Sequence, residues 1–436
     1  MIDSYDWDFD YSEMTAAAAV SAADSSGLIL SNHSYGYDAL VADMGRYESE
    51  ARSVDAVAEA VPYLLPFWAA GNDQEFLTSK GGYQSITFNG LAKNVLTVGA
   101  VDDAVVAGSR SLDNVTIGYF SSLGPCDDGR IKPDLVANGV DLYSSVASGD
   151  SAYDFFSGTS MAAPSAVGSA ALVASLYARE FSGERMPASM LKGLLIHTAD
   201  DVGNPGPDYT YGWGLINVKA AADLVMEHKG SLASPKLIRG VITNEESTQT
   251  HLLAWDGVSP IRATLCWTDP AGDVQSQADS RTPNLIHDLD VSIVSPDTQE
   301  THSPFVMPFV GSWTTASMSL PASTGRNGVD NVEQVLIGSP NQPGVYTVLV
   351  SLGSTLRFSE QEYSLILTGG TGVEANPPPA VTLTSPMDGT IVLEGDELLL
   401  SADASDLGLG GVPGSVVQVT FWVNDELLVT QSSAPY

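Results

Sequence analysis

The sequence predicts an α/β domain followed by two all-β domains, and three observations support this prediction. Apolar strand-like segments alternate with helical segments over residues 1–229, the pattern of a parallel sheet with helices on both faces. Short alternating strands separated by Pro, Gly and Asn turns fill residues 236–370, which indicates a sandwich or jelly roll. Residues 377–436 begin with three prolines and predict a partial β-sandwich that lacks its closing strands.

The composition excludes several classes of partner. Among 436 residues, 53 are Asp or Glu and 18 are Lys or Arg, which gives a net charge of -35. So acidic a chain is not expected to bind nucleic acid or an anionic membrane, and no apolar run is long enough for a membrane span. Cys126 and Cys266 form neither a metal spacing nor a disulfide framework. The acidic N-terminus is no signal peptide, so either the protein is intracellular or this chain starts downstream of its true beginning.

The first domain is expected to alternate helices and strands in chain order. Hydrophobic patterning predicts helices over residues 11–23, 44–60 and 218–227, and strands over residues 27–32, 61–70 and 96–100. In an open parallel sheet, functional residues gather at the carboxyl ends of the strands. Ser34 and Asn72 both follow such ends, which makes them candidates for a site.

The strongest chemical signal is the stretch Phe-Ser-Gly-Thr-Ser-Met-Ala-Ala-Pro at residues 156–164. It opens a run of small residues, 162–178, that predicts a buried helix with Ser160 in its first turn. The free N–H groups and the positive dipole end of a helix start can hold a developing oxyanion. The alternative is that Thr159 or Ser160 merely caps the helix, and the short motif alone does not decide between the two.

The full nine residues resemble the nucleophile motif of subtilisin-like serine peptidases, Gly-Thr-Ser-Met-Ala-x-Pro, with every position matched. This resemblance implies that Ser160 is the nucleophile that forms an acyl-enzyme. Ala69-Ala70-Gly71-Asn72 is similar to the family's Ala-Ala-Gly-Asn element. That similarity implies that Asn72 donates to the oxyanion, and that Ala69, Ala70 and Gly71 line the pocket for the residue before the scissile bond. On local sequence alone, Asn72 would be a turn residue.

Ser34-Tyr35-Gly36 resembles the family's exposed edge strand. The resemblance implies that a substrate peptide pairs with this edge through main-chain hydrogen bonds. His33 lies immediately before it, and we expect His33 to be structural, since strand alternation turns it away from the substrate side.

The family's catalytic base is missing from this sequence. In subtilisins the chain order is Asp, His, Ser, and the histidine lies in His-Gly-Thr-x-Val-Ala-Gly, which does not occur here. A serine hydroxyl is a poor nucleophile without a base, so we expect this chain to be an inactive fragment of the enzyme. The six histidines are His33, His197, His228, His251, His287 and His302.

Sedolisin peptidases share the Gly-Thr-Ser signature but use a Glu and an Asp one helical turn apart, with an Asp at the oxyanion. Here Glu13 is followed four residues later by Ala17, and the oxyanion position is Asn72. Both departures count against a sedolisin.

The later part of the chain also resembles one branch of the family. Residues 265–270, 284–290 and 332–335 look like its C-terminal jelly-roll domain, which buttresses the catalytic domain in enzymes that commonly bind calcium. Asp288, Asp290 and Glu333 have the oxygen ligands that Ca²⁺ prefers, although polar turn and cap residues are the favoured interpretation. Residues 380–436 resemble a bacterial immunoglobulin-like module.

The resemblance therefore predicts a secreted, monomeric serine endopeptidase that acts on polypeptides. No cofactor is expected for its chemistry, and a structural calcium ion is the metal considered. The alternative is a catalytically inactive scaffold that binds peptides or surfaces through the edge strand and the β modules.

Overall fold

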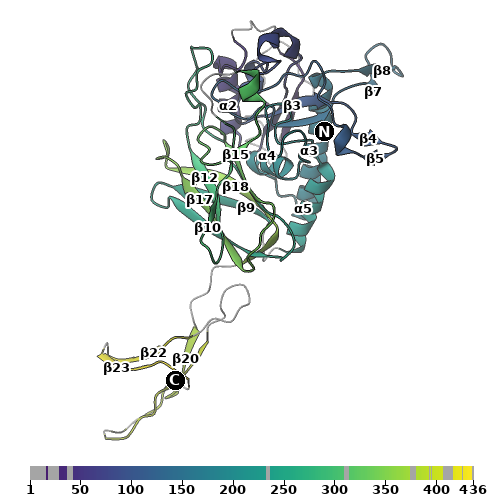
Figure 1. The fold of residues 1–436 in the computed structure, drawn as a ribbon. Coiled ribbons are helices and arrows are strands. Elements are labelled where there is room, and N and C mark those ends of the chain that lie inside the picture. The colour runs from purple at the N-terminus through teal and green to yellow at the C-terminus, as the bar shows by residue number, and fades with distance from the viewer. Residues whose placement is uncertain are drawn as a thin grey trace.

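The computed structural model describes residues 16–17, 29–36, 43–231, 236–308, 314–373, 380–391, 393, 395–405, 416–424 and 426–434. An α/β domain and an antiparallel β domain pack against each other, and the last four strands lie beyond them (Figure 1). The fold class is therefore the α/β domain followed by β domains that the sequence predicts.

A parallel sheet of four strands forms the centre of the α/β domain. Its order is β1 (Leu30–His33), β2 (Leu65–Ala69), β3 (Leu96–Val101) and β6 (Leu135–Asn138). Strand β3 is buried at every residue, which explains why it is a continuous apolar run in the sequence. Strand β2 starts later than expected, because residues 62–63 form a turn, and only residues 16–17 of the helix expected at 11–23 are described.

Helices cover both faces of this sheet. Phe67 on β2 packs into the cluster that holds α3 (Thr159–Glu180), while the next residue, Trp68, packs against Ala51 and Val54 of α2 (Ser49–Ala60). Two more helices, α4 (Ala188–His197) and α5 (Val218–Gly230), pack beside α3. Among the described helices, α3 is long and apolar enough to cross a membrane, yet it lies on the sheet as a core helix.

The β domain consists of two antiparallel sheets that face each other across one apolar core. On β12 every second side chain is buried, the alternation expected of a strand with one face on a core. The first sheet has the order β13 (Thr301–His302), β12 (Leu289–Val294), β17 (Val345–Leu352), β10 (Thr248–Trp255) and β19 (Gly370–Val373). The second has the order β16 (Val332–Ile337), β11 (Ile261–Cys266), β18 (Glu360–Thr368) and β9 (Leu237–Thr243).

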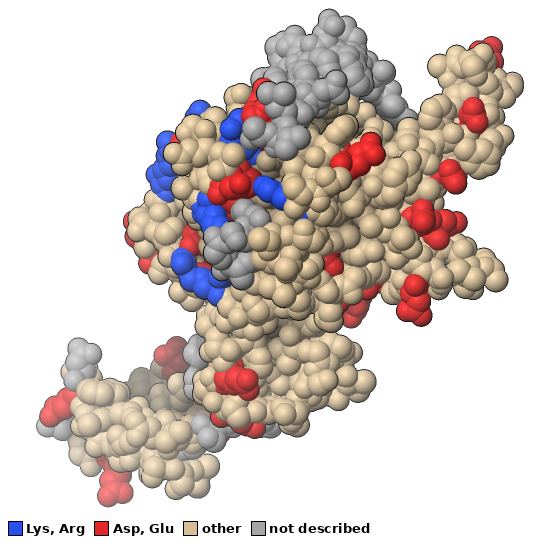
Figure 2. Space-filling view, turned by 45° about the horizontal axis from the view of Figure 1, so that its top comes forward, with Lys and Arg blue, Asp and Glu red and all other residues tan. Residues whose placement is uncertain are grey.

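The remaining strands form pairs. Two hairpins project from the α/β domain, β4 (Val105–Val106) with β5 (Ser109–Arg110), and β7 (Leu142–Ser145) with β8 (Tyr153–Phe156) (Figure 1). On the arms that project at the right of Figure 2, Asp and Glu are visible and Lys and Arg are not. The C-terminal pairs are β20 (Ala380–Ser385) with β21 (Ser401–Ser405), and β22 (Val419–Val423) with β23 (Glu426–Gln431). The other short elements are η1 (Gln74–Lys80), η2 (Phe88–Leu91), η3 (Leu112–Asn114), β14 (Phe305–Val306), α6 (Thr315–Met318) and β15 (Ser323–Thr324).

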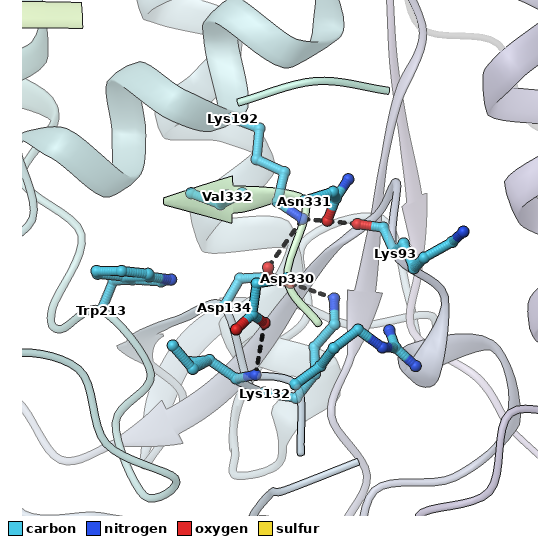
Figure 3. A pocket seen from close by; sticks show the side chains of 10 residues that line it. Lys93, Lys132, Asp134, Lys192, Trp213, Asp330, Asn331 and Val332 are labelled. Carbon is cyan, nitrogen blue, oxygen red and sulfur yellow. Dashed lines mark hydrogen bonds and ion pairs between the residues drawn. The ribbon is translucent and has the colours of Figure 1, made fainter. Parts of the chain in front are cut away.

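A buried ionic network joins the α/β domain to the β domain. Lys93 forms an ion pair with Asp269 and also donates to the carbonyl oxygens of Pro270 at 2.6 Å and Asn284 at 2.8 Å. Lys192 on α4 lies 2.9 Å from Asp134, which also pairs with Lys132, beside a small polar cavity (Figure 3). Charges buried this deeply are tolerable only when paired, so this cavity belongs to a structural joint between the domains.

Candidate active site

The nucleophile candidate, Ser160, lies in the first turn of α3 directly beside the end of β1. Its hydroxyl donates to the carbonyl oxygen of Ser34 at 3.3 Å, and the Ser34 hydroxyl donates to the Ser160 carbonyl oxygen at 2.9 Å. The side chain is half-buried, which leaves it reachable from solvent. The structure thus brings the expected substrate edge and the expected nucleophile into contact across 126 residues of chain.

The oxyanion candidate, Asn72, is held by the residue before the nucleophile. The Asn72 Oδ1 atom accepts hydrogen bonds from the backbone nitrogen of Thr159 at 2.9 Å and from its hydroxyl at 3.0 Å. The same hydroxyl accepts from the backbone nitrogen of Gly71 at 3.2 Å, and Thr159 is fully buried. Because both hydrogen bonds engage the amide oxygen, the amide nitrogen Nδ2 faces the turn that precedes Ser160. It lies 3.7 Å from the position that a Cβ atom on Gly158 would take.

The segment expected to line the pocket follows β2 and is fixed by Ser122. Ala69 ends the strand and Ala70 is buried. Gly71 has a φ of +108°, and a Cβ added there would lie 2.8 Å from the Ser122 Oγ atom, so only glycine fits. The Ser122 hydroxyl in turn accepts from the backbone nitrogen of Asp73 at 3.1 Å.

The positioning roles of Thr159 and Ser122 were not predicted from the sequence. In the sequence Thr159 is a candidate helix cap, and no motif given above contains Ser122. Each contacts residues far away in the chain, and local sequence gives no signal for such a partner.

His33 is the histidine nearest in sequence to the edge strand, and its partners are residues other than Ser160. Its ring stacks on Trp68 with centroids 3.9 Å apart, and its nitrogens hydrogen-bond the hydroxyls of Tyr35 at 2.8 Å and Ser31 at 2.9 Å. Burial lowers the pKa of His33 to about 3, so the ring is neutral at pH 7. This agrees with the expected structural role. Gly36 has open space around it, as a substrate-facing edge requires.

The other five histidines are bound elsewhere in the molecule. Four of them bond side chains at the domain boundary or in the β domain, and His228 accepts from the backbone nitrogen of Lys236 at 3.2 Å. The four side-chain pairs are His197 with Thr264 and Thr368, His251 with Tyr363, His287 with Gln361, and His302 with Ser295. No histidine of this chain is therefore bonded to Ser160 in the structure.

The expected calcium ligands each have a protein partner, while one buried oxygen of Asp288 and one of Glu333 have no hydrogen bond, and a calcium site there stays a prediction. Asp288 forms an ion pair with Arg326, whose Nε atom lies 3.8 Å from Asp290. Glu333 is fully buried and accepts from the backbone nitrogen of Val291 at 2.8 Å, while its second oxygen has no hydrogen bond. Within the described ranges, no three or more His, Cys, Asp or Glu side chains are grouped as metal ligands. A guanidinium supplies the positive charge beside Asp288 and Asp290.

Comparisons with known proteins match two parts of the chain. The model of the subtilase family matches residues 3–214, and that of a bacterial Ig domain matches residues 379–436. Serine protease AprX of Bacillus subtilis (strain 168) is 33% identical over 200 residues, 43% of this chain and 41% of the relative. The serine protease/ABC transporter B family protein tagA of Dictyostelium discoideum is 28% identical over 285 residues, 58% of this chain and 15% of the relative.

Among solved structures, the prenylagaramide maturation protease PagA has a TM-score of 0.37 and 21% identity, covering 51% of this chain and 70% of that one. The chain spans less than half the length of each curated relative named above.

Proposed function

Because residues 3–214 belong to the subtilase family, we propose that this chain carries the nucleophile and oxyanion half of a serine endopeptidase site. Ser160 Oγ attacks the carbonyl carbon of a peptide bond, and the amine that leaves takes up the proton, so that an acyl-enzyme remains for water to hydrolyse. The observation that supports the proposal is the hydrogen bonding of the Asn72 amide oxygen by Thr159, which leaves the amide nitrogen as the donor for an oxyanion.

The substrate would lie along the strand end at residues 34–36. Main-chain groups there are expected to pair with an extended peptide, so that binding tolerates many side chains. The side chain before the scissile bond would lie along Ala69–Gly71. Substrate would displace the contact between the Ser160 hydroxyl and the Ser34 carbonyl oxygen, which at 3.3 Å is a long hydrogen bond.

The general base is proposed to come from a polypeptide segment that bears the family's histidine motif, which this sequence does not contain. Its imidazole would take the Ser160 proton in the attack and return it to the leaving amine. The six histidines of this chain support this assignment, since all have partners other than Ser160.

Covalent labelling tests the proposal. A fluorophosphonate should label Ser160 slowly in this chain and faster when imidazole is added, because the small base substitutes for the missing side chain. Ser160→Ala should remove the label, and Asn72→Ala should slow it by about 10²–10³-fold, since an oxyanion donor is lost. Rapid peptide hydrolysis by the chain alone, abolished in Ser160→Ala, would instead show that a base is already present.

A second candidate function is an inactive scaffold that binds peptides at the same edge. This function is favoured by the observation that each of the six histidines has a hydrogen-bond partner other than Ser160. It predicts peptide binding without any labelling of Ser160, with or without imidazole. For either function we propose a monomer that acts outside the cell, on the grounds of the family and of the Ig module.

A further inference from the structure

The β7–β8 hairpin, which ends four residues before Ser160 in the chain, presents an aromatic face to solvent. Strand pairing places Tyr143 opposite Phe155 and Ser145 opposite Tyr153, so the three aromatic residues share one face of the hairpin. The ring of Tyr143 stacks on that of Tyr153 with centroids 5.4 Å apart, and lies 4.9 Å from that of Phe155. Their exposed fractions are 62% for Tyr143, 57% for Tyr153 and 61% for Phe155, so this face is open among the residues that the structure describes.

The base of the hairpin is fixed to the nucleophile turn. The backbone nitrogen of Gly158 donates to the carbonyl oxygen of Gly139 at 2.8 Å. Asp141 donates from its backbone nitrogen to the Ser157 hydroxyl at 2.9 Å, and that hydroxyl donates back to the Asp141 carboxylate at 3.2 Å. The hairpin that carries the aromatic face is therefore anchored at its base to the nucleophile turn.

The charged residues of the segment that forms this hairpin are all acidic. No Lys or Arg occurs between Lys132 and Arg179, whereas Asp141, Asp150 and Asp154 lie at the base, in the turn and on β8 of the hairpin. The projecting arms in Figure 2 show the same bias toward Asp and Glu. Aromatic faces attract cations through their quadrupole, and nearby carboxylates add to that attraction, so the complementary ligand is a cationic side chain.

We propose that the aromatic face of β7–β8 binds an arginine or lysine side chain of the polypeptide that lies at Ser160. The proposal rests on the proposed function for the identity of the polypeptide, and it adds a preference for basic sequence near the scissile bond. Arginine should be preferred to lysine, because its planar guanidinium stacks on aromatic rings and is more weakly hydrated.

Binding of defined peptides to the Ser160→Ala chain tests this preference without any turnover. The probes are three Gly- and Ser-rich octapeptides that differ at one position, which is Arg, Lys or Gln. Isothermal titration calorimetry should show the Arg peptide binding about 3- to 30-fold more tightly than the Gln peptide, the range for one cation–π contact. In Tyr143→Ser/Tyr153→Ser this ratio should fall to about one.

The matched control is Val105→Ser/Val106→Ser on the β4–β5 hairpin, which also projects and is half exposed. This variant should keep the Arg-to-Gln ratio of the parent chain. Equal binding of the three peptides would overturn the proposal, as would an Arg preference that survives the double tyrosine variant. Binding of a soluble oligosaccharide, or self-association that the tyrosine variant abolishes, would identify a different occupant and also overturn it.

Two readouts separate this proposal from the proposed function. If Ser160 is not labelled but the Arg preference remains, the proposed peptidase function is contradicted and the basic-peptide site is supported. If Ser160 is labelled but no Arg preference is seen, only the proposed basic-peptide site is contradicted. Circular dichroism melting of each variant shows that the hairpin substitutions leave the domain folded.

Discussion

The side-chain oxygen of Asn72 accepts two hydrogen bonds from Thr159, one from its backbone nitrogen and one from its hydroxyl. Residue 72 follows the second strand of the sheet and residue 159 begins the long helix α3. Their contact therefore fixes Asn72 and the first turn of α3 as one unit. The side-chain amide of Asn72 therefore has a fixed orientation although the residue is exposed to solvent.

Thr159→Val should lower the rate of Ser160 labelling about 10-fold and the free energy of unfolding by about 1–3 kcal/mol. Valine removes the hydroxyl, leaves the part-buried Gly71 nitrogen without its acceptor and takes one of the two hydrogen bonds from the Asn72 amide oxygen. Thr159→Ser is the control, since it keeps the hydroxyl and costs about 1 kcal/mol for one lost methyl. Equal labelling rates in the two variants would show that the hydroxyl does not position Asn72.

Gly139→Ala should destabilise the α/β domain by about 1–3 kcal/mol through overpacking. A Cβ at Gly139 would lie 2.7 Å from the Ala100 Cβ and 2.9 Å from the Ala162 Cβ, under the nucleophile turn. Gly168 lies within α3, and a Cβ added there would meet nothing within 4 Å. Gly168→Ala should therefore stabilise the helix by up to about 1 kcal/mol. Chemical denaturation of both variants checks this, and a loss of stability in Gly168→Ala would contradict the open space seen there.

Lys93→Met should cost about 3–5 kcal/mol, because it leaves the Asp269 carboxylate buried without its cation. Both side chains are fully buried at the joint between the domains, so the melting transitions of the two domains should also separate. Lys219→Met, in an exposed pair with Asp223, should change the free energy of unfolding by less than about 0.5 kcal/mol. A small effect of Lys93→Met in calorimetry would mean that the joint tolerates an unpaired carboxylate.

The stability of the α/β domain should depend on pH through His33. Burial sets its folded pKa at about 3, below the value near 6.5 expected for an unfolded chain, so the unfolded state binds a proton first. The stability that this shift contributes is complete above pH 6.5 and is lost as pH falls, by about 2 kcal/mol at pH 5. His33→Gln lacks this loss, so the stability advantage of the parent over the variant should shrink between pH 6.5 and pH 5. A constant difference across that range would contradict the buried, neutral ring.

The fold could be predicted where one element carries its own pattern. The strand expected at residues 96–100 and the alternation of β12 both match the structure, because burial on two faces or on one face leaves a direct mark on the sequence. Helix α4 was not predicted. All of its residues except Ser189 are buried, so it has no polar face to reveal a helical period.

The site could be predicted only in part. Ser160 and Asn72 were found through a family resemblance, and no spacing rule would have joined residues 88 apart in the chain. The contacts of Thr159 with Asn72, and of Lys93 with Asp269 across 176 residues, depend on tertiary packing. Charge patterns in a sequence show which groups exist, but burial and partners decide what they do. Arg326 illustrates this, since its ion pairs with Asp288 and Asp290 could not be predicted from the sequence.

The most direct measurement is the site and rate of fluorophosphonate labelling, mapped by mass spectrometry, in this chain with and without imidazole. We predict a single label on Ser160 that imidazole accelerates and that Asn72→Ala slows by about 10²–10³-fold. No label on Ser160 under any condition, or a rate that does not change in Asn72→Ala, would contradict the assignment of these two residues as nucleophile and oxyanion donor.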